Sequence, residues 1–470
     1  MMLSSRIAIV KEHAMGTVKN ITEGNIYKNY LRYATPLILS SVLASLYSTV
    51  DAVIAGKFIS EHALGAISST SSFDILFQSF FNGFSCGFAL YIAQLFGKGD
   101  YAAIKRNVVN MVTFVAALSA AVSLLAIFFR GTILDYLNID PLLRKDAELY
   151  FVIYTSSYLI AFVNMVLLHT LHALGITSFS LLTSVVSAVI NIAGNLVAVL
   201  VLDWGVAGLA LSTVLSLLSV TGIYLYVMAK AFRDLKSETV SYRFRLAVVK
   251  ESLSYTLPIA VQKLAFHATG IFFAPALNGL GAAATTGYSV MTRMYNLCGQ
   301  SFWNMCSAVD CHTAQAVGAG NVPKIRRGLV AGLWMNVAAL TPFVLLFTLF
   351  AEPIALLFFP ADYHGLALEY AVRFFEVYSL FLYVNMIGHL MHSYMRSIGR
   401  VTTVLWVTLF GSFVRVAATL LLIPVLQMDG VYLALVLSWA ADGALSVLLY
   451  FFLYHSEEKL QKIVAQILHK

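Results

Sequence analysis

The chain has 470 residues, of which 60% are hydrophobic and only 11% are charged, and its mean hydropathy is +0.82. This composition excludes an ordinary soluble globular protein and indicates a polytopic membrane protein. The formal net charge of +7 follows from membrane topology, so it gives no reason to expect a nucleic-acid partner.

Residues 1–25 are expected to form a cytoplasmic N-terminal segment. They carry Arg6, Lys11 and Lys19 but no long apolar core followed by a small-residue cleavage site. A cleaved secretory signal is therefore not expected.

Twelve apolar stretches follow, and each is close to the roughly 20 residues that a helix needs to cross the hydrocarbon. In chain order they span approximately 34–58, 63–95, 107–129, 147–174, 178–202, 205–231, 254–277, 282–316, 328–350, 366–394, 401–425 and 430–454. We expect an all-α membrane protein with twelve transmembrane helices. The second, fourth, eighth and tenth stretches exceed the minimum length, so we expect them to tilt, bend or protrude.

The basic residues predict the orientation in the membrane. Of the thirty Lys and Arg residues, twenty-two lie in the termini or in loops after even-numbered helices. Basic residues are retained on the cytoplasmic side. The sequence therefore predicts a multi-pass protein of the cell (inner) membrane with both termini in the cytoplasm.

The chain repeats itself. The segment at 93–106 reads AQLFGKGDYAAIKR, and the segment at 314–327 reads AQAVGAGNVPKIRR. The lead-in to the first helix of each half also recurs, with Pro36 matching Pro258. Because six helices separate the copies, both halves have the same orientation, and the pseudo-twofold axis relating them runs along the membrane normal.

The repeat predicts two six-helix bundles. The N-lobe covers 26–231 and the C-lobe covers 251–454; a charged cytoplasmic linker at 232–250 joins them, and a cytoplasmic tail follows at 455–470. Duplicated bundles of this kind are how many secondary transporters build a central site that can face either side.

The chain resembles the multidrug and toxic compound extrusion (MATE) family along nearly its whole length. The resemblance rests on a TPLILSS or LPIAVQK opening in each lobe, on VDAVIAGKF late in the first helix, and on the duplicated loop motif. It implies a V-shaped pair of bundles that exports organic, often cationic, compounds in exchange for protons or sodium ions. We predict a secondary antiporter that works by alternating access as a monomer, with an organic small molecule and membrane lipid as partners and no cofactor.

Asp51 is the leading candidate for ion coupling. A charge near the membrane midplane costs roughly 2.5–3.5 kcal/mol on insertion scales and is retained only with partners or a function. Asp51 follows Tyr47, Thr49 and Val50, and loss of hydration there favours the protonated carboxyl group. Such an acid can exchange one cation for another. The alternative is a packing acid hydrogen-bonded to neighbouring hydroxyls.

Polar residues in the fifth and sixth helices are the expected neighbours of Asp51. Asn191 and Asn195 lie four residues apart on one helix face, and Thr213 lies in the next helix. The resemblance to the DinF-like branch of the family assigns a cation site to these positions and to Asp51. The family more often has Asp at the position of Asn195, so Asp51 is the only acid here. Such a site can bind a proton, and sodium stays open as the alternative because hard cations are held by oxygen count and charge together. Interhelical hydrogen bonding is the other explanation for both Asn residues.

The NorM-like branch carries a Glu partway along the seventh helix. This chain has Lys263 and His267 in that stretch. The resemblance is therefore closer to the DinF-like branch.

The C-lobe carries a different set of charges. Arg415 occupies the position that matches Asn191, and on the tenth helix Arg373 lies between Glu369 and Glu376 at helical spacing. We expect Arg373 to pair with one of these Glu residues as scaffolding, and Arg415 to pair with a carboxylate, because an unpaired buried cation is unfavourable.

A possible substrate cavity or C-lobe charge network is the other hypothesis for these residues. It would use Glu376, Arg415, Asp442 and Asp310. In this hypothesis Glu376 or Asp442 faces the cavity and attracts a cationic substrate.

Histidine pairs with HxxH spacing occur once in each lobe, as His169 with His172 and His389 with His392. Two His residues make an incomplete metal site, so no metal is expected. Polarity inherited by both copies explains them, and a pH-sensing gate is the alternative. The four cysteines lie in predicted helices without metal-binding spacing and are expected to be free thiols.

Other function classes have less support. No GxxxxGK[ST] loop is present, so an ion gradient rather than ATP must supply the energy. An enzyme would need a coherent acid and base or a metal set, and we expect none. A lipid-linked oligosaccharide flippase of the same superfamily is the nearer alternative, since it would use intramembrane cations such as Lys263, Arg293, Arg373 and Arg415.

Overall fold

The computed structural model describes residues 18–54, 61–137, 139, 141–360 and 362–469, with the side chains at 46–53 and 61–72 outside the description. The described residues form helices and their connections and contain no strand. Over the residues that the structure describes, each of the twelve apolar stretches lies on one or more helical elements. The prediction of an all-α membrane protein is confirmed.

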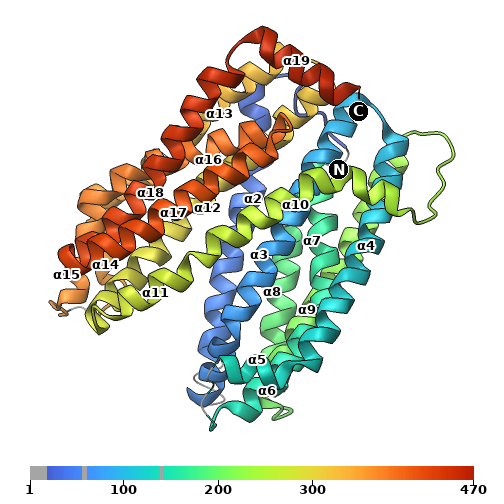
Figure 1. Cartoon of the computed structure of the whole chain (residues 1–470). Coiled ribbons are helices and arrows are strands. Elements are labelled where there is room, and N and C mark those ends of the chain that lie inside the picture. Colours follow the sequence, from blue (N-terminus) through green and yellow to red (C-terminus); the bar gives the residue numbers. More distant parts are fainter. Residues whose placement is uncertain (1–17, 55–60, 138, 140, 361, 470) are drawn as a thin grey trace, which may run out of the picture. The chain divides into compact units, whose positions relative to one another are not determined.

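Among the described residues, the first six stretches lie on seven helices, and the short helix α5 lies between the third and fourth stretches (Figure 1). These are α2 (Ile26–Ile54), α3 (Glu61–Lys98), α4 (Tyr101–Phe128), α5 (Arg130–Tyr136), α6 (Arg144–Ser156), α7 (Tyr158–Ala173), α8 (Phe179–Leu200) and α9 (Gly205–Asp234). The short helix α5 was not expected from the sequence.

The remaining six stretches and the tail form the second series. Its α-helices are α10 (Leu246–Ala268), α11 (Gly270–Asn278), α12 (Ala282–Gly318), α13 (Val322–Leu349), α14 (Ala351–Leu356), α15 (Leu366–Arg373), α16 (Leu382–Ser397), α17 (Val401–Leu426), α18 (Met428–Leu449) and α19 (Glu457–Leu468). Two π-helical turns and one 3₁₀ turn complete it: η2 (Phe374–Tyr378), η3 (Ser379–Phe381) and η4 (Tyr450–Tyr454).

Within the described ranges, nine helical spans are long and apolar enough to cross a membrane, and a tenth is added if the bent pair α6 and α7 counts as one span. The two remaining stretches lie on α2 and α12. The pair α6 and α7 bends by 43° at Ser157, which agrees with the expected bend of the fourth stretch. The tenth stretch contains η2 and η3 between α15 and α16, and such irregular turns often mark functional or strained positions.

The chain packs as two compact units. Unit 1 lies within Met1–Asn20 and Thr35–Ala260, and unit 2 comprises Ile21–Ala34 and Val261–Lys470. The boundaries therefore fall inside α2 and α10, a few residues after the start of each repeat. The segment at the start of each repeat therefore packs with the other repeat. The lobe boundaries at 26–231 and 251–454 were drawn from the sequence repeat, and they stay a prediction.

The duplicated loop motif has a clear structural role in each unit. Gly99 and Gly320 have positive φ values of 79° and 69°, which end α3 and α12 at the conformation that glycine adopts most easily. The next residues, Asp100 and Asn321, accept a hydrogen bond from the backbone N–H three positions later and begin α4 and α13. The motif therefore ends one helix at its glycine and begins the next helix at the following residue.

The Gln of the same motif forms a hydrogen bond to the segment that leads into the first helix of the other repeat. In unit 1, Gln94 accepts a hydrogen bond of 2.8 Å from the Tyr255 hydroxyl. In unit 2, Gln315 accepts one of 3.0 Å from the backbone N–H of Ile21. The buried Tyr30 adds a second contact in unit 2, donating to the Gly328 carbonyl over 3.0 Å.

Small residues bring α3 and α10 close together in unit 1. A Cβ at Gly87 would lie 2.6 Å from Cα of Thr256, and a Cβ at Gly83 would lie 2.7 Å from the carbonyl oxygen of Ile259. Close backbone approach through glycine is a common way to pack membrane helices.

Gly87→Ala is expected to destabilise the protein by about 1–3 kcal/mol, because the added methyl group meets backbone that cannot move independently. The midpoint of thermal denaturation in detergent would fall. Gly222→Ala is the matched control, since Gly222 is also helical and nothing lies within 4 Å of its added Cβ. Equal midpoints for the two variants would contradict this account of the packing.

The tail at 455–470 contains the amphipathic helix α19, which was not expected from the sequence. Leu460, Ile463 and Val464 are buried on one face of it, and α19 packs on α12 and α13 (Figure 1). Arg326 of the loop motif lies 3.6 Å from Glu457. The tail therefore covers the loop motif of unit 2.

Candidate functional site

Asp51 lies in the helical backbone of α2, and its side chain falls outside the described residues. Its place in the predicted cation site therefore stays a prediction. The other three residues of that site lie on α8 and α9.

Asn191, Asn195 and Thr213 form a chain of hydrogen bonds. The amide of Asn195 donates to Oδ1 of Asn191 over 3.2 Å, and the amide of Asn191 donates to the hydroxyl of Thr213 over 3.2 Å. Both Asn side chains are buried. The structure therefore brings together three of the four residues that the sequence singled out.

Helix packing explains why these three residues meet. A Cβ at Gly194 would lie 2.9 Å from Oγ of Ser212, so glycine at this position lets α8 approach α9. The Thr213 hydroxyl donates to the Leu209 carbonyl over 3.1 Å and accepts from the Asn191 amide. Amide and hydroxyl oxygens of this kind can accept a hydrogen bond from a protonated group or ligate a hard cation.

A second intramembrane acid, Asp74 on α3, was missed by the sequence analysis. Its carboxylate accepts hydrogen bonds from the Tyr158 hydroxyl (3.0 Å), the Gln78 amide (3.0 Å) and the Tyr154 hydroxyl (3.4 Å). All three donors are neutral. The sequence feature that could have identified Asp74 is an isolated acid within the apolar second stretch.

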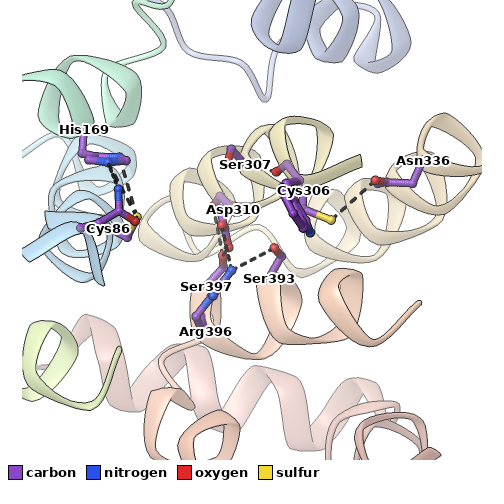
Figure 2. A network of polar contacts seen from close by, with 11 residues as sticks. Cys86, His169, Cys306, Ser307, Asp310, Asn336, Ser393, Arg396 and Ser397 are labelled. Atoms are coloured by element: carbon purple, nitrogen blue, oxygen red, sulfur yellow. Dashed lines mark hydrogen bonds and ion pairs between the residues drawn. The ribbon is translucent and has the colours of Figure 1, made fainter. Parts of the chain in front are cut away.

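The first histidine pair has separate polar contacts. His172 Nε2 lies 2.8 Å from the Ser180 hydroxyl, and His169 Nε2 lies 3.4 Å from the Asn82 amide. Figure 2 shows His169 beside Cys86, with Sγ of Cys86 3.8 Å from His169 Nδ1. The described residues contain no group of three or more His, Cys, Asp or Glu residues that could hold a metal ion.

In unit 2, Asp310 on α12 pairs with Arg396 on α16. Nη2 of Arg396 lies 3.2 Å from Oδ2 of Asp310, and the Ser397 hydroxyl donates to the same carboxylate over 3.3 Å. Arg396 also donates to the Ser393 hydroxyl over 3.2 Å (Figure 2). Since the carboxylate is already neutralised, this pair is better suited to holding α12 on α16 than to attracting a substrate.

Asp442 on α18 has a different partner. Its Oδ2 lies 3.2 Å from Nε2 of His392, the second member of the HxxH pair of this unit. A Cβ at Gly388 would lie 3.0 Å from the same carboxylate oxygen, and a Cβ at Gly411 would lie 3.0 Å from Asp442 Cβ. The two glycines leave room for this carboxylate among α16, α17 and α18.

Two expected ion pairs are corrected. Among the described residues, Arg373 pairs with Asp429 at 2.6 Å rather than with Glu369 or Glu376. The π-helical turn η2 changes the helical register beyond Arg373, and Glu376 lies exposed within that turn. Asp429 instead comes from the first turn of α18.

The expected carboxylate partner of Arg415 is also corrected, because its guanidinium contacts an aromatic ring. Its guanidinium lies 5.0 Å from the centre of the Phe273 ring, and no described carboxylate lies within 4.0 Å of it. A cation over an aromatic face is stabilised by the ring quadrupole, so the aromatic ring replaces the expected acid.

Comparisons with known proteins agree with this architecture. The sequence model of the MatE family matches residues 36–197 and 258–421. The chain is 24% identical over 465 residues to the probable multidrug resistance protein YoeA of Bacillus subtilis (strain 168), covering 94% of this chain and 96% of that protein. It is 22% identical over 292 residues to the multidrug export protein MepA of Staphylococcus saprophyticus, covering 61% of this chain and 64% of that protein.

A solved structure shows the same fold. A crystal structure of MATE in the bent conformation matches with a TM-score of 0.86 at 18% identity, covering 96% of this chain and 100% of that one. The family match, which spans well over half of the 470 residues, carries the assignment. The chain belongs to the MatE family and is a multi-pass membrane transporter, not an enzyme.

Proposed function

We propose that the protein is a secondary antiporter that exports organic, cationic compounds in exchange for protons by alternating access. The observation that carries the coupling part is the buried chain of Asn191, Asn195 and Thr213, at the positions where the resemblance to the DinF-like branch places a cation site. The multidrug names of the relatives support the substrate class. We further propose that the protein works as a monomer in the cell membrane with both termini in the cytoplasm.

In this mechanism Asp51 carries the coupling proton. Protonation removes the negative charge from α2, and a neutral helix segment can repack against its neighbours without the desolvation penalty of a carboxylate. Repacking of α2 then releases the substrate to the outside. Return of the proton to the cytoplasm restores the charge and the starting arrangement.

The proton is favoured over sodium because the chain has Asn195 where the family more often has Asp. A hard cation such as sodium is held by several oxygens together with sufficient negative charge. With one carboxylate at the predicted site, a proton needs only that single acid.

Asn195→Asp is expected to introduce sodium dependence. The added carboxylate lies next to Asn191 and supplies the second negative charge that a sodium site requires. Stimulation of efflux by an imposed sodium gradient should increase several-fold over the unmodified protein. Asn195→Gln, which retains the amide, is the control, and an equal sodium response in the two variants would contradict the prediction.

The proposed function is tested with the full-length protein in sealed proteoliposomes loaded with ethidium, a fluorescent organic cation. A proton gradient and a sodium gradient are imposed in separate experiments. Efflux driven by the proton gradient supports the proposal, and efflux driven by sodium alone changes the coupling ion. If correctly oriented protein responds to neither gradient, organic-cation antiport is wrong.

The flippase alternative is not favoured. The names of the relatives refer to multidrug resistance and export. Among the intramembrane cations that kept this alternative open, Arg373 is paired with Asp429 and Arg415 lies over Phe273. If the ethidium experiment fails, movement of a lipid-linked oligosaccharide is the next measurement.

A further inference from the structure

The fourth apolar stretch bends without a proline. The helices α6 and α7 meet at 43° on either side of Ser157, and residues 144–173 contain neither Pro nor Gly. Sharp bends usually occur at such a residue or where a side chain interrupts the backbone hydrogen bonds. A bend without proline is held by contacts, and contacts can change.

Hydroxyl groups satisfy the backbone at this bend. The N–H of Ser157 donates to the Tyr154 carbonyl over 3.0 Å, and the Ser157 hydroxyl donates to the same carbonyl over 2.6 Å. The Thr155 carbonyl accepts from the Ser123 hydroxyl of α4 over 2.5 Å. Backbone groups freed by a break inside a membrane need such partners. The bent backbone is therefore a satisfied arrangement.

The carboxylate of Asp74 on α3 bridges the bend. Its Oδ1 accepts from the hydroxyl of Tyr158, the first residue of α7, over 3.0 Å, and its Oδ2 accepts from the hydroxyl of Tyr154 on α6 over 3.4 Å. Gln78, one turn along α3, donates to Oδ2 over 3.0 Å and to the Tyr154 hydroxyl over 3.2 Å. Each carboxylate oxygen therefore holds one side of the bend. We call Asp74, Gln78, Tyr154 and Tyr158 the bend clamp.

No described cation lies within 4.0 Å of the Asp74 carboxylate. The arginines of α5 and α6 are paired elsewhere, Arg130 with Glu148 and Arg144 with Asp135, each over 2.6 Å. A charge in a membrane span is retained only with partners or a function. A carboxylate without a counter-ion can become neutral by binding a proton.

Tyrosines are the titratable groups that face Asp74 among the described residues. Tyr154 and Tyr158 donate to it, and Tyr150 stacks on Tyr154 with ring centres 5.4 Å apart. The helices α4 and α9 also pack on α6 and α7. Neither brings a described acid or base within hydrogen-bonding distance of Asp74. A change of charge at this site is therefore a change at Asp74 itself.

Protonation changes what the carboxyl group can hold. An ionised carboxylate only accepts hydrogen bonds, whereas the protonated group also carries an O–H that must donate. Hydrogen bonds to a charged acceptor are roughly twice as strong as those between neutral groups. Proton binding at Asp74 therefore weakens the bonds to Tyr154 and Tyr158 together, and both sides of the bend are held less tightly.

We propose that Asp74 is a proton-binding site and that proton binding releases the bend clamp, so that the bend of the fourth span changes with protonation. The proton comes from solvent and returns to it. This site is separate from Asp51, Asn191, Asn195 and Thr213, and it goes beyond the proposed function because it needs no substrate. In the proposed orientation Asp74 lies in the outer half of α3, so protons reach it from outside.

Infrared difference spectroscopy of the full-length protein, between mildly alkaline and mildly acidic pH, tests proton binding. A protonated carboxyl group has a carbonyl stretching band that a carboxylate lacks. Asp74→Asn should remove one pH-dependent band of this kind, and Asp51→Asn should leave that band in place. Tyr158→Phe keeps Asp74 but removes a donor to its charged form, so the band should appear about one pH unit higher. Tyr136→Phe changes a tyrosine that is 86% exposed on α5 and should not move the band.

Hydrogen–deuterium exchange at a single pH tests the bend, because the intrinsic chemical rate is then constant. Asn has nearly the shape of a protonated Asp and no charge. Asp74→Asn should therefore speed exchange of the amides at 154–161 by about fivefold. Tyr158→Phe should act similarly, and the variant that combines the two should add little, because both release one clamp. The amides of α8 are the internal reference and should not change.

The proposal is overturned if Asp74→Asn retains every pH-dependent carboxyl band, or if its amides at 154–161 exchange as in the unmodified protein. If Asp74→Asn does not fold, an unshifted band in Tyr158→Phe overturns the proposal equally. Faster exchange with the band retained makes the clamp a packing feature that binds no proton.

Failure of the proposed function is a different result, because neither measurement involves transport. If band and exchange behave as expected while proteoliposomes export no ethidium under either gradient, the bend clamp stands and the antiport mechanism is wrong. If export follows the proton gradient while the variants show unchanged bands and exchange, the antiport mechanism stands and the clamp proposal is wrong.

Discussion

Asp51→Asn is expected to reduce gradient-driven efflux of an organic cation by at least about tenfold. The substitution removes the protonatable group and leaves a neutral amide of nearly the same size. If proton binding at Asp51 supplies even about 1.4 kcal/mol of coupling free energy, its loss corresponds to a tenfold change. The measurement is the initial rate of ethidium efflux from proteoliposomes under an imposed proton gradient.

Two variants make the result specific. Asp51→Glu retains an acid and should keep part of the activity. Asp135→Asn removes an exposed carboxylate that pairs with Arg144, and it should transport normally because exposed ion pairs contribute little. Unchanged efflux in Asp51→Asn, with normal amounts of folded protein in the membrane, would eliminate Asp51 as the coupling residue.

Arg396→Met is expected to cause the largest loss of stability, about 3–5 kcal/mol, because it leaves the carboxylate of Asp310 without its counter-ion. The two side chains are only 15% and 21% exposed, so water compensates little of the charge. Neutral hydrogen bonds between membrane helices contribute about 0.6 kcal/mol on average, and the Ser397 and Ser393 hydroxyls therefore do not replace the guanidinium. The midpoint of denaturation in detergent should fall accordingly.

The double variant Arg396→Met, Asp310→Leu separates charge from packing. Replacing both partners of a buried pair with apolar groups is often neutral, so the double variant should recover most of the loss. Lys462→Met breaks the exposed pair with Glu458, whose side chains are 71% and 75% exposed, and it should change the midpoint little. Losses at Arg396 and Asp310 that simply add would contradict the buried-pair interpretation.

The sequence was sufficient for features that depend on local pattern. The apolar runs predicted the helical segments, because the hydrocarbon admits helices with satisfied backbone groups. The repeated loop predicted the duplicated organisation, and the spacing of Asn191 and Asn195 predicted their shared helix face. The amphipathic pattern of α19 was also present, with Leu460, Ile463 and Val464 at helical spacing, but it was not recognised.

Partners from distant parts of the chain were decided only by the tertiary structure. Helical spacing favoured Glu369 or Glu376 for Arg373, yet the turn η2 alters the register of Glu376, and Asp429 supplies the charge from α18. Arg415 meets a ring in place of an acid.

The same holds for the site residues. By itself the sequence determined that this chain is a duplicated bundle of membrane helices and identified the candidate polar residues within it. Only packing decided that Asp74 meets Tyr154 and Tyr158 across the bend of α6 and α7. The physical reason is that periodicity specifies which face of a helix is polar, whereas the neighbour that this face meets depends on how close each helix can approach the next.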